Sequence, residues 1–152
     1  MAEAPGYDIE LTHTFNATRE RVFRAFTDPE QFAMWYGPDG FPARADSVEI
    51  DPQAGGTHRF AMESEADPSI RTAFDGHVTE VVPDQLVAIS GSWVGIPGLS
   101  GPWPSHLRVE FHAVGGATRV LLREGPHPTG TAELGYQAWE MMFMKLDAML
   151  GG

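Results

Sequence analysis

The chain has 152 residues, of which 42% are hydrophobic and 20% are charged, and its formal net charge is −11. This composition predicts one globular domain over residues 1–152, whose acidic surface disfavours nucleic acid and anionic membranes as partners. The lack of cysteine excludes disulfides, thiolate metal sites and a cysteine nucleophile. No apolar run reaches the ~20 residues of a membrane span, and no signal-peptide pattern is visible, so we expect a cytoplasmic protein.

The first predicted element is a strand over residues 7–15, in which apolar and polar residues alternate strictly. His13 lies on the apolar side of this strand, and we interpret it as a hydrogen-bonded structural histidine. Two short helices are expected next. The first covers residues 19–27, and the second lies within residues 28–37, where an Asp-Pro pair favours a helix start and a glycine favours its end.

After the second helix, the sequence has the alternation and turn residues of a strand-rich region. Strands are predicted over residues 43–50, 57–62, 70–82, 85–93, 106–114 and 118–124. Short turns between consecutive strands, such as Gly115-Gly116, favour an antiparallel meander with one wet face. Residues 94–105 form the only long irregular stretch, which is rich in glycine and proline.

The last predicted element is a helix over residues 133–150 with one apolar face. The large side chains on that face are Trp139, Met142, Phe143, Leu146, Met149 and Leu150. Burial of this face would contribute about 10–15 kcal/mol before opposing terms, at roughly 1.5–3 kcal/mol for each side chain. A helix of this kind needs a broad apolar surface, so we predict that it closes the sheet and that function lies between the two.

Several short motifs occur in one order along residues 9–150. They are Phe15-Asn16-Ala17, Val22 to Glu30, Trp35 to Phe41, Glu49-Ile50-Asp51, Gly55 to Phe60, Gly76 to Pro83 and Gly116 to Val120. In this order they resemble the activator-of-Hsp90-ATPase homologue (AHSA1) family of the START-like, or SRPBCC, superfamily. The resemblance implies an α+β helix-grip fold with two short helices after the first strand. In that fold a curved antiparallel sheet of about six to seven strands wraps around the long C-terminal helix, with a hydrophobic cavity between them.

The sequence departs from the family pattern on the last helix. Members usually carry a Gly-Trp pair there, often with a histidine about one turn earlier. Here Trp139 matches the tryptophan, but Ala138 replaces the glycine and Gly135 occupies the histidine position. Chemistry assigned to that histidine is therefore not carried over to this chain.

Candidate ligand-binding residues follow from the faces predicted above. Those expected on the sheet and the last helix are His58, Phe60, Met62, Phe74, Phe111, Trp139, Met142 and Phe143. Trp35 and Trp93 are expected near the cavity entrance, and Trp103 on the loop above it. The alternative is that these side chains simply form a solid core. The tryptophans and methionines favour a cavity, because they are large and methionine adapts to variable partners.

Histidines are the strongest candidates for polar chemistry. His58 shares a face with apolar residues, where it can act as an acid or base, although a satisfied core histidine is the reading we prefer. His106 and His112 lie six residues apart on one strand, ~20 Å, which is too far to share a metal ion. His127 lies in a loop without an evident carboxylate partner. We therefore assign no metal, no cofactor and no catalytic residue.

Three functions remain open at this point. We expect a protein that binds a small apolar or aromatic molecule in the cavity. The alternatives are a cyclase- or aromatase-like enzyme that uses His58 in the same cavity, and a co-chaperone that stimulates the ATPase of an Hsp90-type partner. Family analogy also implies a homodimer.

Overall fold

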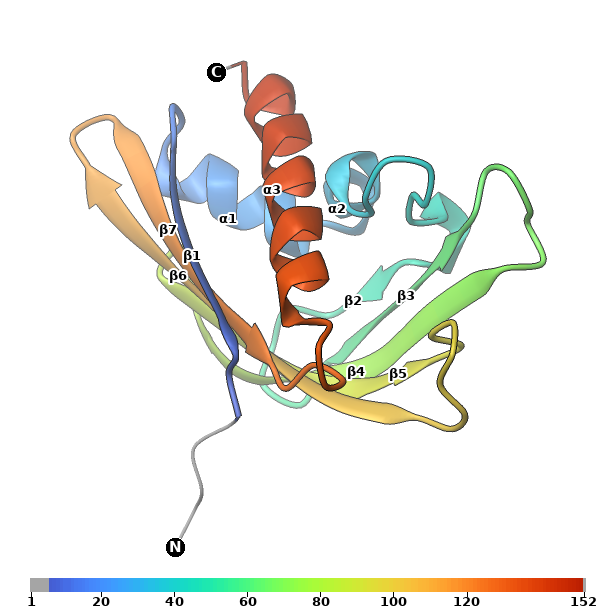
Figure 1. Ribbon diagram of the computed structural model, residues 1–152. Helices are drawn as coiled ribbons and strands as arrows, with labels where there is room; N and C mark the ends of the chain where they lie inside the picture. Colours follow the sequence, from blue (N-terminus) through green and yellow to red (C-terminus); the bar gives the residue numbers. More distant parts are fainter. Residues whose placement is uncertain (1–5, 152) are drawn as a thin grey trace, which may run out of the picture.

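A curved antiparallel sheet of seven strands forms the frame of the protein, which we describe over residues 6–151 of a computed structural model (Figure 1). The strands are β1 (Ile9–Phe15), β2 (Glu49–Ile50), β3 (Thr57–Glu63), β4 (Arg71–Val82), β5 (Leu86–Val94), β6 (Trp103–Val114) and β7 (Ala117–Gly125). Strands β2 to β7 form a meander, and β1 pairs with β7, so the order is β1-β7-β6-β5-β4-β3-β2. This architecture confirms the predicted α+β helix-grip fold.

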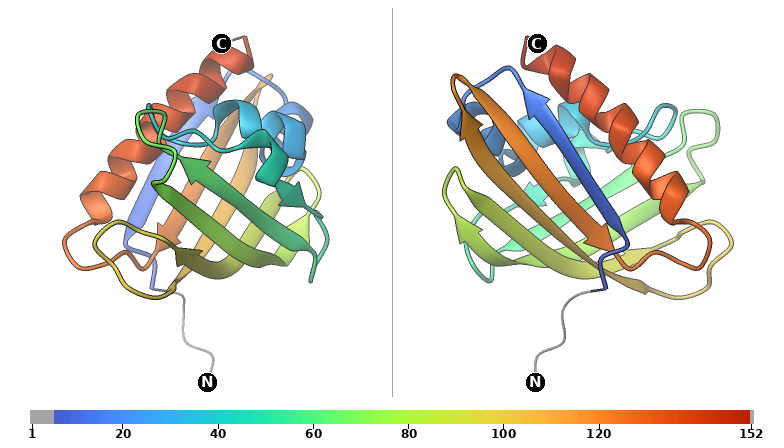
Figure 2. Two further views of the ribbon diagram at one scale, coloured as in Figure 1. Left: turned by 90° about the vertical axis from the view of Figure 1, so that its right-hand side faces the viewer. Right: turned by 60° about the vertical axis from the view of Figure 1, so that its left-hand side comes forward.

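Three α-helices lie on the concave side of this sheet (Figures 1 and 2). They are α1 (Arg19–Thr27), α2 (Pro29–Trp35) and α3 (Ala132–Met149). Thr18 caps α1 by accepting a hydrogen bond from the Arg21 amide at 3.4 Å, and Asp28 caps α2 through the Glu30 amide at 3.2 Å. None of the helices within residues 6–151 is long and apolar enough to cross a membrane.

Two predicted strand boundaries are wrong. Residues 43–50 contain a short 3-10 helix, η1 (Ala45–Ser47), and they pair with β3 only through an isolated bridge between Ala43 and Met62 and through the two-residue strand Glu49–Ile50. The Ser47 hydroxyl donates to the Arg44 carbonyl at 2.6 Å and accepts from the Ala61 amide at 2.9 Å, so a side chain takes the place of the backbone ladder. Strand β6 begins at Trp103 instead of residue 106, because Trp103 pairs with Trp93 across the end of β5.

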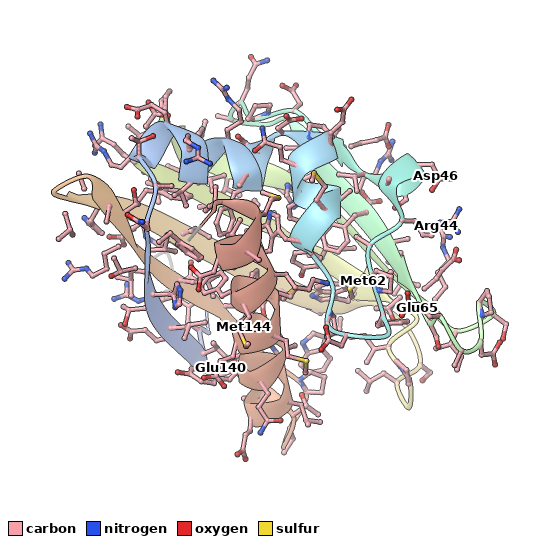
Figure 3. The ribbon with its side chains drawn as sticks, turned by 90° about the horizontal axis from the view of Figure 1, so that it is seen from above. Arg44, Asp46, Met62, Glu65, Glu140 and Met144 are labelled. Carbon is pink, nitrogen blue, oxygen red and sulfur yellow. The ribbon has the colours of Figure 1, made fainter. Side chains whose placement is uncertain are left out.

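The core lies between the sheet and the predicted apolar face of α3. Trp139, Met142, Phe143, Leu146 and Leu150 are all buried, and Met149 is partly buried. The opposite side of α3 faces solvent, where Glu140 is exposed and Met144 is 72% exposed (Figure 3). The periodicity of the sequence therefore identified the buried face correctly.

Candidate functional site

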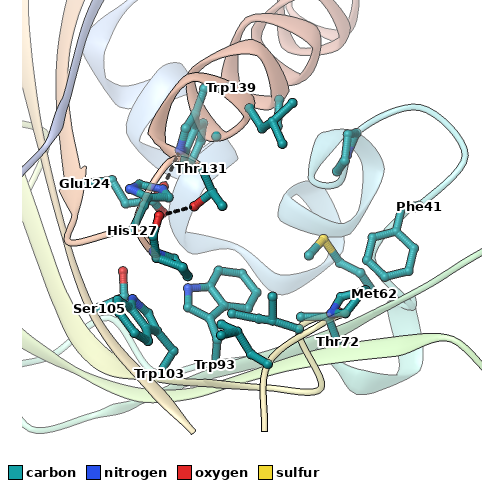
Figure 4. Close-up of a pocket in the computed structure, with 18 of the residues that line it drawn as sticks. Phe41, Met62, Thr72, Trp93, Trp103, Ser105, Glu124, His127, Thr131 and Trp139 are labelled. Carbon is teal, nitrogen blue, oxygen red and sulfur yellow. Dashed lines mark hydrogen bonds and ion pairs between the residues drawn. The ribbon is translucent and has the colours of Figure 1, made fainter. Parts of the chain in front are cut away.

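A cavity of about 690 Å³ lies beneath the first half of α3 (Figure 4). Its roof is the α3 segment from Leu134 to Met142, and its floor is formed by inward side chains of β3, β4, β5 and β6. Two loops, residues 95–102 and 126–131, and the segment after α2 complete the wall. The cavity is thus lined by segments that lie far apart in the sequence.

Most of the cavity wall is apolar, and a hydrogen bond joins its β6 side to the loop of residues 126–131. Met62, Trp93 and Trp103 line the cavity from the sheet, and Trp139 and Met142 line it from α3. The Trp103 indole N–H donates to the carbonyl of Pro126 at 2.8 Å. This bond connects the start of β6 to the loop that leads into α3, and so holds one side of the cavity together.

Glu124 is the buried carboxylate of the cavity wall. It is 7% exposed at the end of β7, and its Oε1 atom accepts hydrogen bonds from Trp139 Nε1 at 2.9 Å and from His127 Nε2 at 3.1 Å. Figure 4 shows Glu124, His127 and Ser105 on one side of the cavity, with Phe41 and Met62 on the other. The cavity therefore has a polar side and an apolar side.

The interpretation of His127 as lacking a carboxylate partner is wrong. Its Nδ1 atom lies 2.6 Å from Asp8 Oδ1, and its Nε2 atom faces Glu124. Neither ring nitrogen is left as a lone-pair acceptor, so the ring is best described as an imidazolium that donates to both carboxylates. Burial alone lowers the pKa of His127, but the hydrogen bonds to and the charges of Glu124 and Asp8 outweigh it and raise the pKa to about 8.

Gly135 makes room for this histidine beside α3. A Cβ atom at Gly135 would lie 2.7 Å from His127 Nε2 and 2.9 Å from Ile9 Cδ1. Glycine therefore stands where the family resemblance leads one to expect a histidine on the helix. The imidazole that fills the adjacent space comes from the preceding loop instead.

A second cavity of only about 20 Å³ adjoins the polar side of the first. The two share Tyr36, Trp93, Ser105 and Glu124 as wall residues, and His58 lines only the smaller one. A volume of this size can hold one water molecule, since about 10–15 Å³ is the minimum.

His58 is a core histidine, but it is not fully satisfied. The ring is 3% exposed and meets Phe32 and Phe60 edge-on. Its Nδ1 atom is the only fully enclosed side-chain nitrogen or oxygen within residues 6–151 that lacks a hydrogen-bond partner. Burial lowers the pKa of His58 to about 4, so its imidazole is neutral at neutral pH.

The predicted ligand-binding residues fall into three groups. Those on the main cavity are Met62, Trp93, Trp103, Trp139 and Met142, and those on the small cavity are His58, Phe60, Phe74 and again Trp93. The remaining residues are Trp35, Phe111 and Phe143, which are buried in the core and line neither cavity. Trp35 was expected near the entrance but is 0% exposed, because its indole N–H donates to the Ala25 carbonyl at 2.9 Å where α2 packs on α1.

Sequence reasoning missed the polar side of the cavity, which comprises Tyr36, Ser105, Glu124 and His127. One signal for Glu124 was present. Val120, Leu122 and Glu124 alternate on one face of β7, and all three are buried, so a carboxylate continues an apolar face. No comparable pattern marks His127, whose partner Asp8 is 119 residues away in the chain. Within residues 6–151, no group of three or more histidine and acidic side chains is arranged to hold a metal ion.

Comparisons with known proteins place this geometry in a family. Protein CV1439 from Chromobacterium violaceum is 27% identical, with a TM-score of 0.82 over 95% of this chain and 96% of that one. The AHSA1 protein from Silicibacter pomeroyi is 24% identical, with a TM-score of 0.78 over 94% of this chain and 96% of that one, which supports the shared fold. DynU16, encoded in the dynemicin biosynthetic locus, has the same fold at 18% identity and a TM-score of 0.69, and the match covers 94% of this chain and 46% of that one.

A comparison with curated proteins gave no match. Residues 16–151, by contrast, match the family described as "Activator of Hsp90 ATPase homolog 1-like protein". This match spans nearly the whole chain and agrees with both the helix-grip fold and the structural neighbours. The chain belongs to the AHSA1 family.

Proposed function

We propose that the protein binds a small apolar or aromatic molecule in the cavity beneath the first half of α3. The observation that carries this proposal is the cavity of about 690 Å³ with a mostly apolar wall. Ligand pockets for small molecules usually have about 300–1,000 Å³ and a few convergent polar groups. The volume and the single polar side of this cavity both agree with that class of site.

The arrangement of the tryptophans supports an aromatic guest. Trp93 and Trp103 lie on the sheet side of the cavity, and Trp139 lies on the helix side. A flat ring inserted between them can make offset or edge-to-face contacts, which are worth about 0.5–1.5 kcal/mol for each pair beyond the burial of area. Met62 and Met142 add unbranched side chains that can adapt to the outline of the guest.

The enzyme alternative depended on His58 and is supported less well. His58 lines only the small cavity, and its pKa of about 4 lies far from neutral pH. A general acid or base works best when its pKa is near the working pH. A homodimer and an Hsp90-type partner remain predictions from family analogy.

The test is saturable binding of N-phenyl-1-naphthylamine, a fluorescent apolar probe, to the intact protein. We expect one site per chain, and at a probe concentration of 100 Kd a stabilisation of about 2.7 kcal/mol against unfolding. In Ala138→Phe, a large ring enters the cavity from α3, so the affinity should fall at least tenfold.

Met144→Phe is the matched control, because it adds an aromatic ring to the solvent-facing side of the same helix. It should bind the probe as the wild type does. Absence of saturable binding, or equal affinities for the wild type and Ala138→Phe, would overturn the proposal.

A further inference from the structure

Three polar side chains gather where the main cavity meets the small one. Tyr36, Ser105 and Glu124 line both cavities, and we call this group the polar end. All three residues are buried, with exposed fractions of 5%, 4% and 7%. They come from the segment after α2, from β6 and from β7, so the fold brings them together from three elements.

Only one of the two carboxylate oxygens of Glu124 accepts hydrogen bonds from the described residues. Its Oε1 atom accepts from both Trp139 and His127, whereas Oε2 accepts no hydrogen bond from residues 6–151. Oε2 is also not a fully enclosed atom, since His58 Nδ1 is the only enclosed and unpartnered side-chain polar atom of the described chain. The same reasoning applies to the Tyr36 hydroxyl, which bonds to none of those residues. Both atoms therefore keep some accessible surface, and both belong to residues that line the two cavities.

The charges around the polar end favour a particular kind of guest. His127 carries one positive charge between the negative charges of Asp8 and Glu124, so the cluster is net negative. No lysine or arginine is among the residues that line the main cavity, all of which lie within residues 6–151. A negatively charged guest would thus meet the Glu124 carboxylate. The imidazolium of His127, which also lines the cavity, is already paired with two carboxylates.

Tyr36 provides a neutral hydroxyl beside this carboxylate. Burial, and secondly the charge of Glu124, raise the pKa of Tyr36 well above its ordinary value, so the phenol stays protonated. A protonated phenol can donate one hydrogen bond and accept another. The polar end can accordingly accept a hydrogen bond at Glu124 and exchange one at Tyr36.

We infer that Glu124 and Tyr36 form a head-group site, so that the ligand of the proposed cavity carries a hydrogen-bond donor, either a hydroxyl or a protonated amine, and not a carboxylate or phosphate. This inference rests on the proposed function. Hydrogen bonds to an ionised acceptor are roughly twice as strong as neutral ones, which gives a donor head group a clear advantage over an apolar one. An anionic head group is repelled, and the low dielectric of the apolar wall strengthens that repulsion.

Four probes with one naphthalene body test the inference: 2-methylnaphthalene, 2-naphthylmethanol, 2-naphthylmethylamine and 2-naphthoate. Their dissociation constants for the wild-type protein are measured by quenching of tryptophan fluorescence, with calorimetry as a check. We expect the alcohol, the amine or both to bind at least tenfold more tightly than methylnaphthalene, and naphthoate to bind most weakly. The ratio between alcohol and amine identifies which donor the site prefers.

Glu124→Gln is the informative variant, because it removes the charge and keeps Oε1 as an acceptor for Trp139 and His127. The amine should lose at least tenfold in affinity, and the penalty on naphthoate should shrink. Methylnaphthalene should bind as before, which shows that the cavity is intact. Glu110→Gln is the matched control, since Glu110 pairs with Arg108 and His112 away from both cavities, and it should leave all four affinities unchanged.

The outcomes separate this inference from the proposed function. Equal binding of all four probes to the wild type, or tightest binding of naphthoate, overturns the head-group site and leaves a ligand-binding cavity. Failure of every probe to bind overturns both. If Glu124→Gln does not fold, the order of the four affinities in the wild type still decides the inference.

Discussion

The two halves of α3 lie over the same sheet, but they are held in different ways. In the second half, Phe143 and Leu146 are 2% and 0% exposed, and Phe143 meets Phe15 and Phe26 edge-on. In the first half, Leu134 is 66% exposed, and a cavity of about 690 Å³ lies below the helix. The second half is thus packed as a solid core, and the first half covers a hollow.

Side-chain size on the helix accounts for much of this difference. Phe143 and Leu146 give the second half large, buried inward side chains, and Trp139 stands one turn earlier, at the end of the first half. In the first half, the cavity-lining residues before Trp139 include the small residues Gly135 and Ala138, and Gly135 packs closely against His127 and Ile9. The first half is tied to the sheet by the Trp139 indole N–H, which donates to Glu124, and by the loop before α3, where His127 contacts Asp8 and Glu124. A helix can therefore lie over a cavity with little apolar packing beneath it when a partly buried ionic network supports the segment that leads into it.

Two truncations on α3 should show the largest difference between its halves. Phe143→Ala leaves a void in the packed half, so we expect a loss of about 3–5 kcal/mol in the free energy of unfolding. Leu134→Ala removes a mostly exposed side chain at the rim of the cavity, and we expect a change within about 0.5 kcal/mol. Denaturant unfolding of both variants measures the contrast. Similar losses in the two variants would contradict the distinction between a solid half and a hollow half.

Acid should lower the stability of the protein through His58, which lines the small cavity. The pKa of His58 is about 4 in the folded protein and about 6.5 when unfolded, so the unfolded chain binds the proton more readily. Stability is then unaffected above pH 6.5 and falls as the pH drops toward 4, by about 3 kcal/mol in total. The free energy of unfolding measured against pH should show this slope in the wild type.

His58→Phe should remove that part of the acid slope, because a phenyl ring fits the aromatic surroundings and does not titrate. His77→Gln is the control, since His77 is exposed on the sheet, and it should keep the wild-type slope. An unchanged slope in His58→Phe would mean that other groups cause the acid sensitivity. Titration of the His58 ring by NMR gives an independent measure of its pKa.

Alkali should lower the free energy of unfolding through His127, by less than acid lowers it through His58. The pKa of His127 is about 8 in the folded state, above its unfolded value of about 6.5. Its contribution is therefore complete below pH 6.5 and is lost as the pH rises through 8. After allowance for the partial exposure of the ring, we expect about 1 kcal/mol.

Unfolding at pH 6.5 and pH 9 measures this contribution in the wild type and in His127→Gln. The variant should lack the alkaline loss, whereas His112→Gln, on the exposed face of β6, should retain it. An alkaline loss of the same size in His127→Gln would show that the network does not hold the first half of α3.

The sequence predicted the secondary structure well where a local pattern carried the information. The alternation in residues 7–15 and the apolar face of residues 133–150 correspond to β1 and α3. The error at residues 43–50 arose because Ser47 bonds to Ala61, a contact that alternation cannot report. The prediction missed the first three residues of β6, because the pairing of Trp103 with Trp93 depends on how far β5 extends.

Local patterns in the sequence were sufficient to predict the fold, because strand alternation and helical spacing indicate which faces are buried. The tertiary structure alone decided the size of the cavity, because a volume is the small difference between the space under α3 and the side chains that enter it. It also decided the polar end and its support, because Tyr36, Ser105 and Glu124 come from separate elements, and His127 reaches Asp8 across 119 residues of chain. Charges that meet only after folding leave no periodic trace in the sequence.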